Sequence, residues 1–315
     1  GVAYADLADA CVSVLADVCE KDVLARFSGR IGKWSVCALG KFGGRELTAT
    51  SDLDLMLIYE PEDETGGNLA TRFVQRLIAA LSAPTEEGTL YEVDMQLRPS
   101  GRAGPVAVKF SSFERYYRED AWTWEFMALT RIRPVAGDPE LGHRIVEAAR
   151  EALRTKAADP KITEDVADMR RRMARERPSR SQWDVKLAPG GLVDMEFVIQ
   201  HAILMSAADV PGAVIPTSMD AIKAIAAAGR LAPGEAAVLA EGLTFQLNLQ
   251  QALRIASGDQ FEPENASAGL KAWLASHLAL KDFSELDARL GQIQAAVAGL
   301  RTRKLGPLST EPGAD

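Results

Sequence analysis

Two aspartates two positions apart are the residues whose types and spacing best suit chemistry. Asp52 and Asp54 stand at the start of an apolar run that ends at Tyr59. Such a run is typical of a strand, on which side chains two apart point to the same side. Neighbouring carboxylates repel each other unless a cation lies between them. Because hard oxygen ligands suit Mg²⁺, the pair predicts a magnesium site.

A glycine-rich stretch lies between two apolar runs, 34–39 and 53–59. It reads as a turn whose glycines bring backbone amides close to an anion, with a lysine and a serine beside them. The pattern is neither a Walker A loop nor a dinucleotide motif. A plain hairpin turn with solvated acids is the alternative, but the combination favours phosphate chemistry. The candidate phosphate-binding residues are Gly40, Lys41, Gly43, Gly44 and Ser51.

A third carboxylate follows in residues 90–98, where apolar and polar residues alternate. This alternation predicts a strand with one polar side, which carries Asp94 and, further on, Arg98. If this strand lies beside the Asp52–Asp54 strand, three carboxylates come together and can hold two cations. Arg98 could then bind a phosphate oxygen. Taken alone, Asp94 is as compatible with a surface acid as with a metal ligand.

The elements around these residues follow from periodicity. Helical spacing predicts a helix over 3–27, with one apolar stripe, and a second helix over 68–83. Further strands are expected at 106–110 and 131–135, and a helix begins at Asp138. We interpret Trp122 and Trp124 as core residues rather than a platform for stacking bases. The stripe on the first helix consists of Leu7, Cys11, Val14, Leu15 and Val18.

Strand signals stop after about residue 150, and the rest of the chain predicts only helices. The fold class is therefore α/β plus α: a catalytic domain over 1–150 with its N-terminal helix, a helical domain over 151–305 and a flexible tail over 306–315. The expected helices cover 162–177, about 191–205, 217–228, 233–257, 267–280 and 283–303.

The first of these helices is rich in charge. Its arginines alternate with acids, which favours a solvated face over a wall against a triphosphate. A Pro-Gly-Gly sequence at 189–191 precedes the next helix, whose first turns hold Asp194 and Glu196. Those acids suit either the helix dipole or a cleft. Lys186 is a further candidate phosphate contact. The arginines are Arg170, Arg171, Arg172, Arg175 and Arg177.

Composition narrows the function classes. The 315 residues carry a formal net charge of −8, which disfavours nucleic acid and anionic membranes as partners. Three cysteines without metal spacing suggest a reducing compartment, and three scattered histidines do not suggest zinc. No signal peptide or membrane-length apolar run occurs, so we expect a cytoplasmic protein. A start at Gly-Val-Ala suggests part of a longer protein.

In this order the motifs resemble those of the bifunctional glutamine synthetase adenylyltransferase/adenylyl-removing family, over about residues 1–260. Pro-Ser-Gly at 99–101 and Trp-Thr-Trp-Glu at 122–125 resemble its C-terminal, AMP-adding half. Gln96 departs from the arginine expected there, which puts contacts near Arg98 in doubt but leaves the carboxylates intact. The matching stretches are 40–47, 51–55, 91–94, 97–101, 121–125, 136–139 and 190–197.

The resemblance implies a nucleotidyltransferase fold of the polymerase-beta-like type, a mixed sheet flanked by helices, followed by a helical bundle. Asp52, Asp54 and Asp94 match the family's catalytic, metal-binding carboxylates. The implied reaction moves AMP from ATP to a tyrosine hydroxyl of glutamine synthetase, releases pyrophosphate and controls nitrogen assimilation. Two Mg²⁺ ions, or Mn²⁺, would assist. Glutamine and the PII signal protein are the implied regulators.

Other functions stay open at this point. The opposed reaction, phosphorolytic removal of AMP, would use a site of the same kind. A nucleotidyltransferase acting on a nucleic-acid end would want a basic, aromatic-lined groove, which the acidic charge and sparse aromatics disfavour. One acting on a small molecule would normally need a smaller helical domain. A regulatory module without catalysis would not need three carboxylates beside glycines.

Overall fold

The structure, a computed structural model, describes residues 1–258 and 261–308. The chain divides into two compact units. The first comprises Gly1–Lys156 and Val214–Thr217, and the second comprises Ala157–Ala213 and Ser218–Asp315. The break therefore follows Lys156 rather than residue 150, and a short segment of the helical half belongs to the first unit. Of the expected tail over 306–315, residues 309–315 lie outside the described part.

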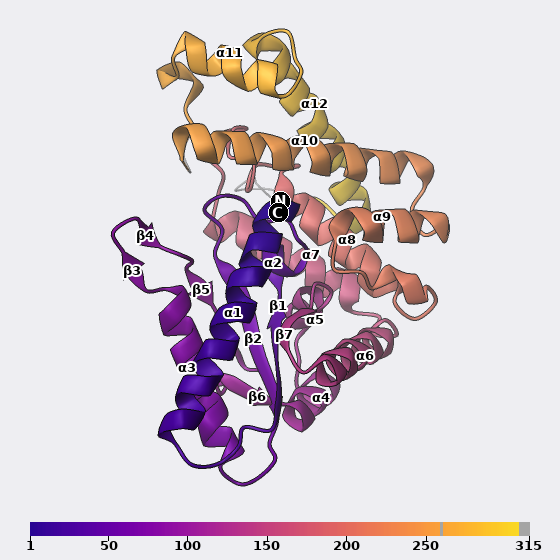
Figure 1. The fold of residues 1–315 in the computed structure, drawn as a ribbon. Coiled ribbons are helices and arrows are strands. Elements are labelled where there is room, and N and C mark those ends of the chain that lie inside the picture. Colours follow the sequence, from indigo (N-terminus) through magenta and orange to yellow (C-terminus); the bar gives the residue numbers. More distant parts are fainter. Residues whose placement is uncertain (259–260, 309–315) are drawn as a thin grey trace. The chain divides into compact units, whose positions relative to one another are not determined.

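A mixed sheet forms the centre of the first unit (Figure 1). Its strands run in the order β5-β2-β1-β7. β6 also pairs with β2, further along that strand than β5 does. β1 is antiparallel to both β2 and β7, whereas β5 and β6 are parallel to β2. The strands span Lys33–Ala38 (β1), Leu53–Glu60 (β2), Val93–Asp94 (β5), Ala107–Lys109 (β6) and Arg133–Gly137 (β7). A small hairpin joins β3 (Pro84–Thr85) to β4 (Gly88–Thr89).

Helices cover both faces of this sheet, so β2 is apolar almost throughout. Helices α1 (Val2–Arg26) and α3 (Gly66–Leu81) share one core with alternate residues of β1 and β2. On the other side, α4 (Phe110–Glu119) and α6 (Pro139–Lys156) contact β2 and β1. The short helix α5 (Thr123–Leu129) leads into β7. The predicted helix over 68–83 and the strands near 106–110 and 131–135 are confirmed.

The helix predicted over 3–27 is present as α1, but its buried face was predicted wrongly. Leu7, Val14 and Val18 are 56%, 63% and 56% exposed, respectively. The buried face consists mainly of small residues, which let the helix approach α3 and the sheet closely. Large apolar residues therefore point outwards. The buried residues are Ala5, Ala8, Val12, Ala16, Cys19 and Val23.

The strand predicted over 90–98 is reduced to Val93–Asp94. The backbone N–H of Gln96 donates to Asp94 Oδ1 at 2.6 Å, a local bond that turns the chain away from the sheet. Strand alternation therefore does not carry Arg98 to the side of Asp94. The glycine turn was also predicted wrongly, because Gly40–Gly43 forms one turn of helix, α2.

The two tryptophans expected in the core lie at the surface. Trp122 is 72% exposed and Trp124 is 38% exposed. The backbone N–H of Trp122 donates to Glu125 Oε2 at 2.9 Å, and Tyr116 Oη donates to Glu125 Oε1 at 2.7 Å. Thr123 and Glu125 are thus buried in this turn, whereas Trp122 and Trp124 are exposed.

The second unit is built from helices in its described part, and all the predicted helices are present. Its central helix, α8, is buried along most of its length and contacts α7, α9, α10 and α12. No described helix in the chain combines the length and apolar character needed to cross a bilayer. The helices are α7 (Ile162–Glu176), α8 (Leu192–Ser206), α9 (Ser218–Ala227), α10 (Pro233–Ser257), α11 (Ala268–His277) and α12 (Phe283–Leu305).

One arginine of α7 contradicts the interpretation of that helix as a solvated face. Arg170 is 2% exposed, and its Nε lies 2.6 Å from Asp194 Oδ1. Asp194 is itself fully buried and accepts a second bond, at 2.6 Å, from the backbone N–H of Gly190. Arg301 Nε approaches its other oxygen at 3.4 Å. Asp194 is thus an interior ion-pair partner rather than an acid that merely favours the helix dipole.

Candidate active site

The carboxylates of the first unit meet where β2 and β5 run side by side. Asp54 and Asp94 are direct register partners in this parallel pair. Neighbouring strands lie about 4.8 Å apart, so the two residues are adjacent across the sheet. Asp52 lies just before β2, is exposed and is two residues from Asp54. The expectation that the two carboxylate-bearing segments are neighbours is therefore confirmed by the strand register.

Asp94 is held in place by the residue that departs from the resembled family. Gln96 donates its backbone N–H to Asp94 Oδ1 at 2.6 Å and its side-chain Nε2 to Oδ2 at 3.0 Å. These donors are neutral, so they orient the carboxylate without cancelling its negative charge. From the sequence, Gln96 put contacts near Arg98 in doubt. In the structure Gln96 instead contacts Asp94, one of the candidate catalytic residues.

Gly40 has a role that its sequence context suggested only in part. Its φ of +51° is a conformation that favours glycine, and a Cβ placed there would lie 2.0 Å from Asp54 Oδ2. The backbone also joins the two segments, because Leu39 N donates to the carbonyl of Asp54 at 2.9 Å. A glycine was expected to let the backbone approach an anion. The anion it approaches is the chain's own Asp54 carboxylate.

The other residues of the predicted phosphate turn serve mainly to pack it. A Cβ on Gly43 would lie 2.1 Å from the carbonyl of Arg131, and one on Gly44 would lie 3.2 Å from Arg131 Nη1. Ser51 Oγ accepts a bond at 3.0 Å from the N–H of Thr48, which shapes the loop before β2. Lys41 is half-buried within α2. Their contacts with phosphate stay predictions.

Arg98 is occupied by its own loop. It is buried and donates to the carbonyls of Met95 at 2.5 Å, Pro105 at 3.0 Å and Gly104 at 3.1 Å. A guanidinium engaged in this way fixes the loop after β5, and the geometry gives no support to a phosphate contact. Lys186 belongs to the second unit, where it is exposed. Its assignment to a phosphate also stays a prediction.

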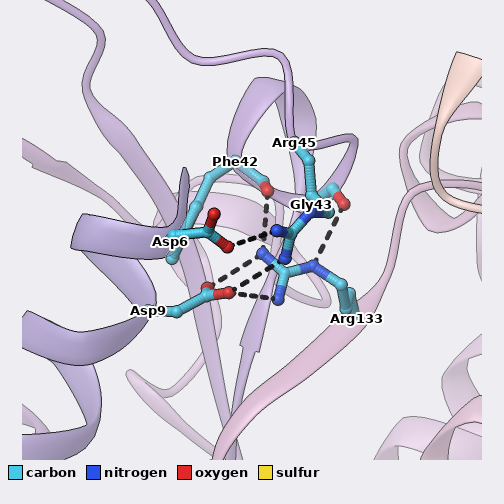
Figure 2. A network of polar contacts seen from close by, with 6 residues as sticks. All are labelled: Asp6, Asp9, Phe42, Gly43, Arg45 and Arg133. Atoms are coloured by element: carbon cyan, nitrogen blue, oxygen red, sulfur yellow. Dashed lines mark hydrogen bonds and ion pairs between the residues drawn. The ribbon is translucent and has the colours of Figure 1, made fainter. Parts of the chain in front are cut away.

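A network of arginines and aspartates next to α2 was missed from the sequence (Figure 2). Arg133 forms a two-pronged ion pair with Asp9 of α1, with both N···O distances 2.9 Å. Arg45, directly after the glycines, approaches Asp9 at 3.3 Å and also pairs with Asp6. Buried Arg131 pairs with Glu46 at 3.1 Å. The sequence shows Arg131 and Arg133 two positions apart at the start of a predicted strand, but no pattern in it connected them with Asp9.

The donor chemistry of the three aspartates fits a hard divalent cation, since all three offer carboxylate oxygens. Within the described residues, no three or more His, Cys, Asp or Glu side chains form a ready metal-binding group. The fit therefore rests on the backbone, which makes Asp54 and Asp94 register partners and places Asp52 beside them.

Comparisons with known proteins agree with the two parts of the chain. Residues 2–148 match the family model for glutamate-ammonia ligase adenylyltransferase. Residues 159–302 match the model for GlnD PII-uridylyltransferase.

Curated relatives extend this similarity over nearly the whole chain. A bifunctional glutamine synthetase adenylyltransferase/adenylyl-removing enzyme of Rhodopseudomonas palustris (strain HaA2) is 40% identical over 97% of the chain and 32% of the relative. Proteins of the same name from Bradyrhizobium diazoefficiens and Xanthobacter autotrophicus are both 39% identical, over 94% and 97% of the chain and 31% and 32% of the relatives. The chain thus spans about a third of the length of the relatives it matches. Over nearly its whole length the chain is therefore similar to one part of the bifunctional glutamine synthetase adenylyltransferase/adenylyl-removing enzymes.

Proposed function

We propose that this chain transfers AMP from ATP to a tyrosine hydroxyl of glutamine synthetase and releases pyrophosphate. The observation that carries the proposal is the register pairing of Asp54 with Asp94, with Gly40 packed against Asp54. The names of the matching family model and of the relatives support the same reaction. The small mixed sheet with helices on both faces suits a nucleotidyltransferase of the polymerase-beta-like type.

Asp52, Asp54 and Asp94 are the residues that would hold divalent cations, two Mg²⁺ ions or Mn²⁺ in their place. Such cations polarise the phosphates of ATP and neutralise the leaving pyrophosphate. The free phenol of tyrosine has a pKa of about 10, so its proton must be removed as the oxygen attacks. One of the three aspartates is our candidate acceptor for that proton. Gln96 keeps Asp94 oriented for its role.

The chain residues around the carboxylates would position the nucleotide. Gly40 lets the backbone of α2 lie directly against Asp54, and Lys41 is the residue that follows Gly40 in this helix. We assign the triphosphate to this segment, with Gly43, Gly44 and Ser51 keeping it compact. Arg98 serves by fixing the loop that follows Asp94.

The direction of the reaction follows from the resemblance to the AMP-adding half. Pro-Ser-Gly at 99–101 and Trp-Thr-Trp-Glu at 122–125 resemble the sequence motifs of that half. Regulation by glutamine and by the PII signal protein, and a cytoplasmic location, belong to the same proposal. Phosphorolytic removal of AMP is the competing assignment, because the relatives' name covers both activities.

The test is to incubate glutamine synthetase with this chain, ATP and Mg²⁺, and to follow AMP on its tyrosines by mass spectrometry. AMP addition by the wild type and none by Asp54→Asn is the expected result. A parallel reaction offers AMP-modified synthetase and phosphate. Release of ADP there, without addition in the first reaction, would assign the chain to AMP removal instead. No reaction in either direction would overturn the proposed function.

A further inference from the structure

The short helix α2 is gripped from outside by residues far away in the sequence. Arg133, at the start of β7, donates through Nη2 to the carbonyl of Phe42 at 3.1 Å and through Nε to the carbonyl of Gly43 at 3.3 Å. These carbonyls belong to the last turn of α2, and that of Phe42 also accepts from the backbone N–H of Arg45 at 3.1 Å. The guanidinium also lies 5.4 Å from the centre of the Phe42 ring. Arg133 therefore holds the C-terminal end of α2 through two of its carbonyls.

Asp9 on α1 fixes the guanidinium that makes these bonds (Figure 2). Its Oδ2 and Oδ1 accept from Arg133 Nη1 and Nη2, both at 2.9 Å. Such a two-pronged pair fixes the plane of a guanidinium as well as its position. Both side chains are largely but not fully buried, at 19% exposed for Arg133 and 25% for Asp9. The pair is thus more shielded from water than an ordinary surface ion pair, which contributes little.

Arg45 ties the chain just beyond α2 to the same aspartate. It has a φ of +58°, which is unfavourable for a residue with a Cβ by about 1–2 kcal/mol. Its guanidinium pairs with Asp9 at 3.3 Å and with Asp6 one helical turn earlier. The ion pairs hold this strained residue in place. Asp9 therefore holds α2 in place through Arg133, and it holds the chain just after α2 in place through Arg45.

The opposite end of α2 lies against the candidate catalytic carboxylate. Gly40 packs on Asp54, where a Cβ would approach Oδ2 to 2.0 Å. Because α2 is one helical turn long, a shift at Gly43 must move Gly40 and Lys41 with it. A displacement of about 1 Å at reacting groups can lower a rate a hundredfold. The position of the carboxylate and of the lysine thus depends on how α2 is held.

We propose that Asp9 and Arg133 are positioning residues, which set α2 against Asp54 and thereby shape the ATP site. The role rests on the proposed function, because it concerns the same site. Neither residue needs to touch the nucleotide. Arg133 acts through the carbonyls of Phe42 and Gly43, and Asp9 acts through Arg133.

The experiment compares Arg133→Lys and Arg133→Gln with the wild type. Lysine keeps the charge but cannot bond Asp9 and both carbonyls with one planar fork. We expect both variants to raise the KM for ATP at least about tenfold and to leave the KM for glutamine synthetase unchanged. Hydrogen exchange at residues 40–44 should quicken in both variants. That readout does not require any transfer activity.

A charge-swapped double variant, Asp9→Arg with Arg133→Asp, separates positioning from simple stabilisation. The swap restores an ion pair between α1 and β7 and leaves Arg45, which loses Asp9, its pair with Asp6, but an aspartate at 133 cannot donate to the carbonyls of α2. We expect the melting temperature to recover relative to Arg133→Gln while the KM for ATP stays high. Recovery of both together would overturn the proposal, since the pair would then serve stability alone.

Arg144→Gln is the matched control. Arg144 forms a similar two-pronged pair with Glu60, at 2.6 and 2.8 Å. Glu60 is the last residue of β2, at the end opposite to Asp54, so this pair lies away from α2. This variant should leave the KM for ATP and the exchange at 40–44 unchanged. Unaltered exchange and KM in the Arg133 variants would overturn the positioning role while wild-type transfer stands. Absence of ATP-dependent transfer by the wild type would overturn the proposed function instead, with the exchange result still readable.

Discussion

The two units use the same residue types, a glycine and an aspartate, in opposite ways. In the first unit Gly40 packs on Asp54, which is half-buried and lies beside two more acids. In the second unit Gly190 donates its N–H to Asp194, which is fully buried and lies between two arginines. Both glycines have positive φ, at +51° and +77°. What differs is the charge around the carboxylate and its access to water.

This difference separates a site from a structural joint. A fully buried carboxylate must be neutralised, and Arg170 and Arg301 neutralise Asp194 from α7 and α12. Carboxylates that are to bind a cation must instead stay accessible and mutually repelling. Asp52 is exposed and Asp54 is half-buried, and the bonds that Asp94 accepts from Gln96 come from neutral groups. We therefore expect substitutions in the first group to remove activity, and substitutions in the second to remove stability.

The largest loss of activity is expected from substitutions of Asp52 and Asp54. Asp52→Asn or Asp54→Asn should abolish AMP transfer, because each loses a charge needed to hold a cation. The melting temperature should not fall, since removing one acid also removes repulsion. Transfer is followed by mass spectrometry and melting by circular dichroism. Near-wild-type activity in Mg²⁺ for either variant would take that residue out of the site.

Asp94→Asn should follow, with a rate lower by several orders of magnitude. Asparagine can still accept a bond from Gln96, so the loop after β5 should keep its shape. ATP binding should therefore fall less than turnover. The measurement is kcat beside the Kd for ATP. An enzyme within about tenfold of the wild type, or roughly 1.4 kcal/mol, would make Asp94 a surface acid.

The opposite outcome is expected for Asp194→Asn. It leaves Arg170 and Arg301 buried without a counter-charge, which should cost about 3–5 kcal/mol of unfolding free energy. Urea titration measures that loss. The part of the variant that remains folded should transfer AMP at the wild-type rate per molecule. A stable variant with no activity would reverse the comparison and place Asp194 in the reaction.

The fold was predictable where apolar periodicity decides the structure. The helices of the second unit, and α3, β1 and β2 in the first, carry clear stripes or runs. The buried face of α1 was not predictable by giving weight to large residues, because half of its buried residues are alanines: Ala5, Ala8 and Ala16. The strand over 90–98 failed because a local bond from Gln96 to Asp94 outweighs the alternating pattern.

The site was predictable in its carboxylates and not in their support. Asp52 and Asp54 are local neighbours, and Asp94 stood out by its type on a short strand. Arg133 and Asp9 lie 124 positions apart, and Arg170 and Asp194 lie 24 apart. Pairs of this kind are specified by the assembled fold, so no spacing rule in one sequence could select them. The exposed tryptophans show the same limit, because residue type alone suggested burial.

A smaller effect is expected from a second buried group of the helical unit, His201. Burial, aided by the charge of Lys304, lowers the pKa of its imidazole from 6.5 to about 4. The folded protein thus holds it neutral, with Nε2 2.9 Å from Thr163 Oγ1. Between these pKa values the unfolded chain binds the extra proton, so stability is present above about pH 6.5 and is lost as the pH falls towards 4.

From pH 7.5 to pH 5 this contribution should amount to about 2 kcal/mol. The measurement compares urea unfolding of the wild type with that of His201→Gln at both pH values, so that other titrating groups cancel. The wild type should lose about 2 kcal/mol more than the variant over this range. Equal losses in the two proteins would show that His201 titrates alike in the folded and unfolded chains.

The smallest effect is expected at Arg171, the neighbour of the buried Arg170 that pairs with Asp194. Arg171 follows Arg170 on α7 but pairs with Asp168 in the same helix, where both side chains meet water, at 29% and 59% exposed. An exposed pair three residues apart contributes at most about 0.5 kcal/mol, because water screens it and ordering two long side chains costs entropy. Arg171→Ala should therefore lower the unfolding free energy by less than about 0.5 kcal/mol, whereas Arg170→Ala should cost about 3–5 kcal/mol. Urea titration of the two variants in parallel measures the difference between neighbours of the same type on one helix. Similar losses in both would mean that burial is not what separates the structural charges of this chain from its solvated ones.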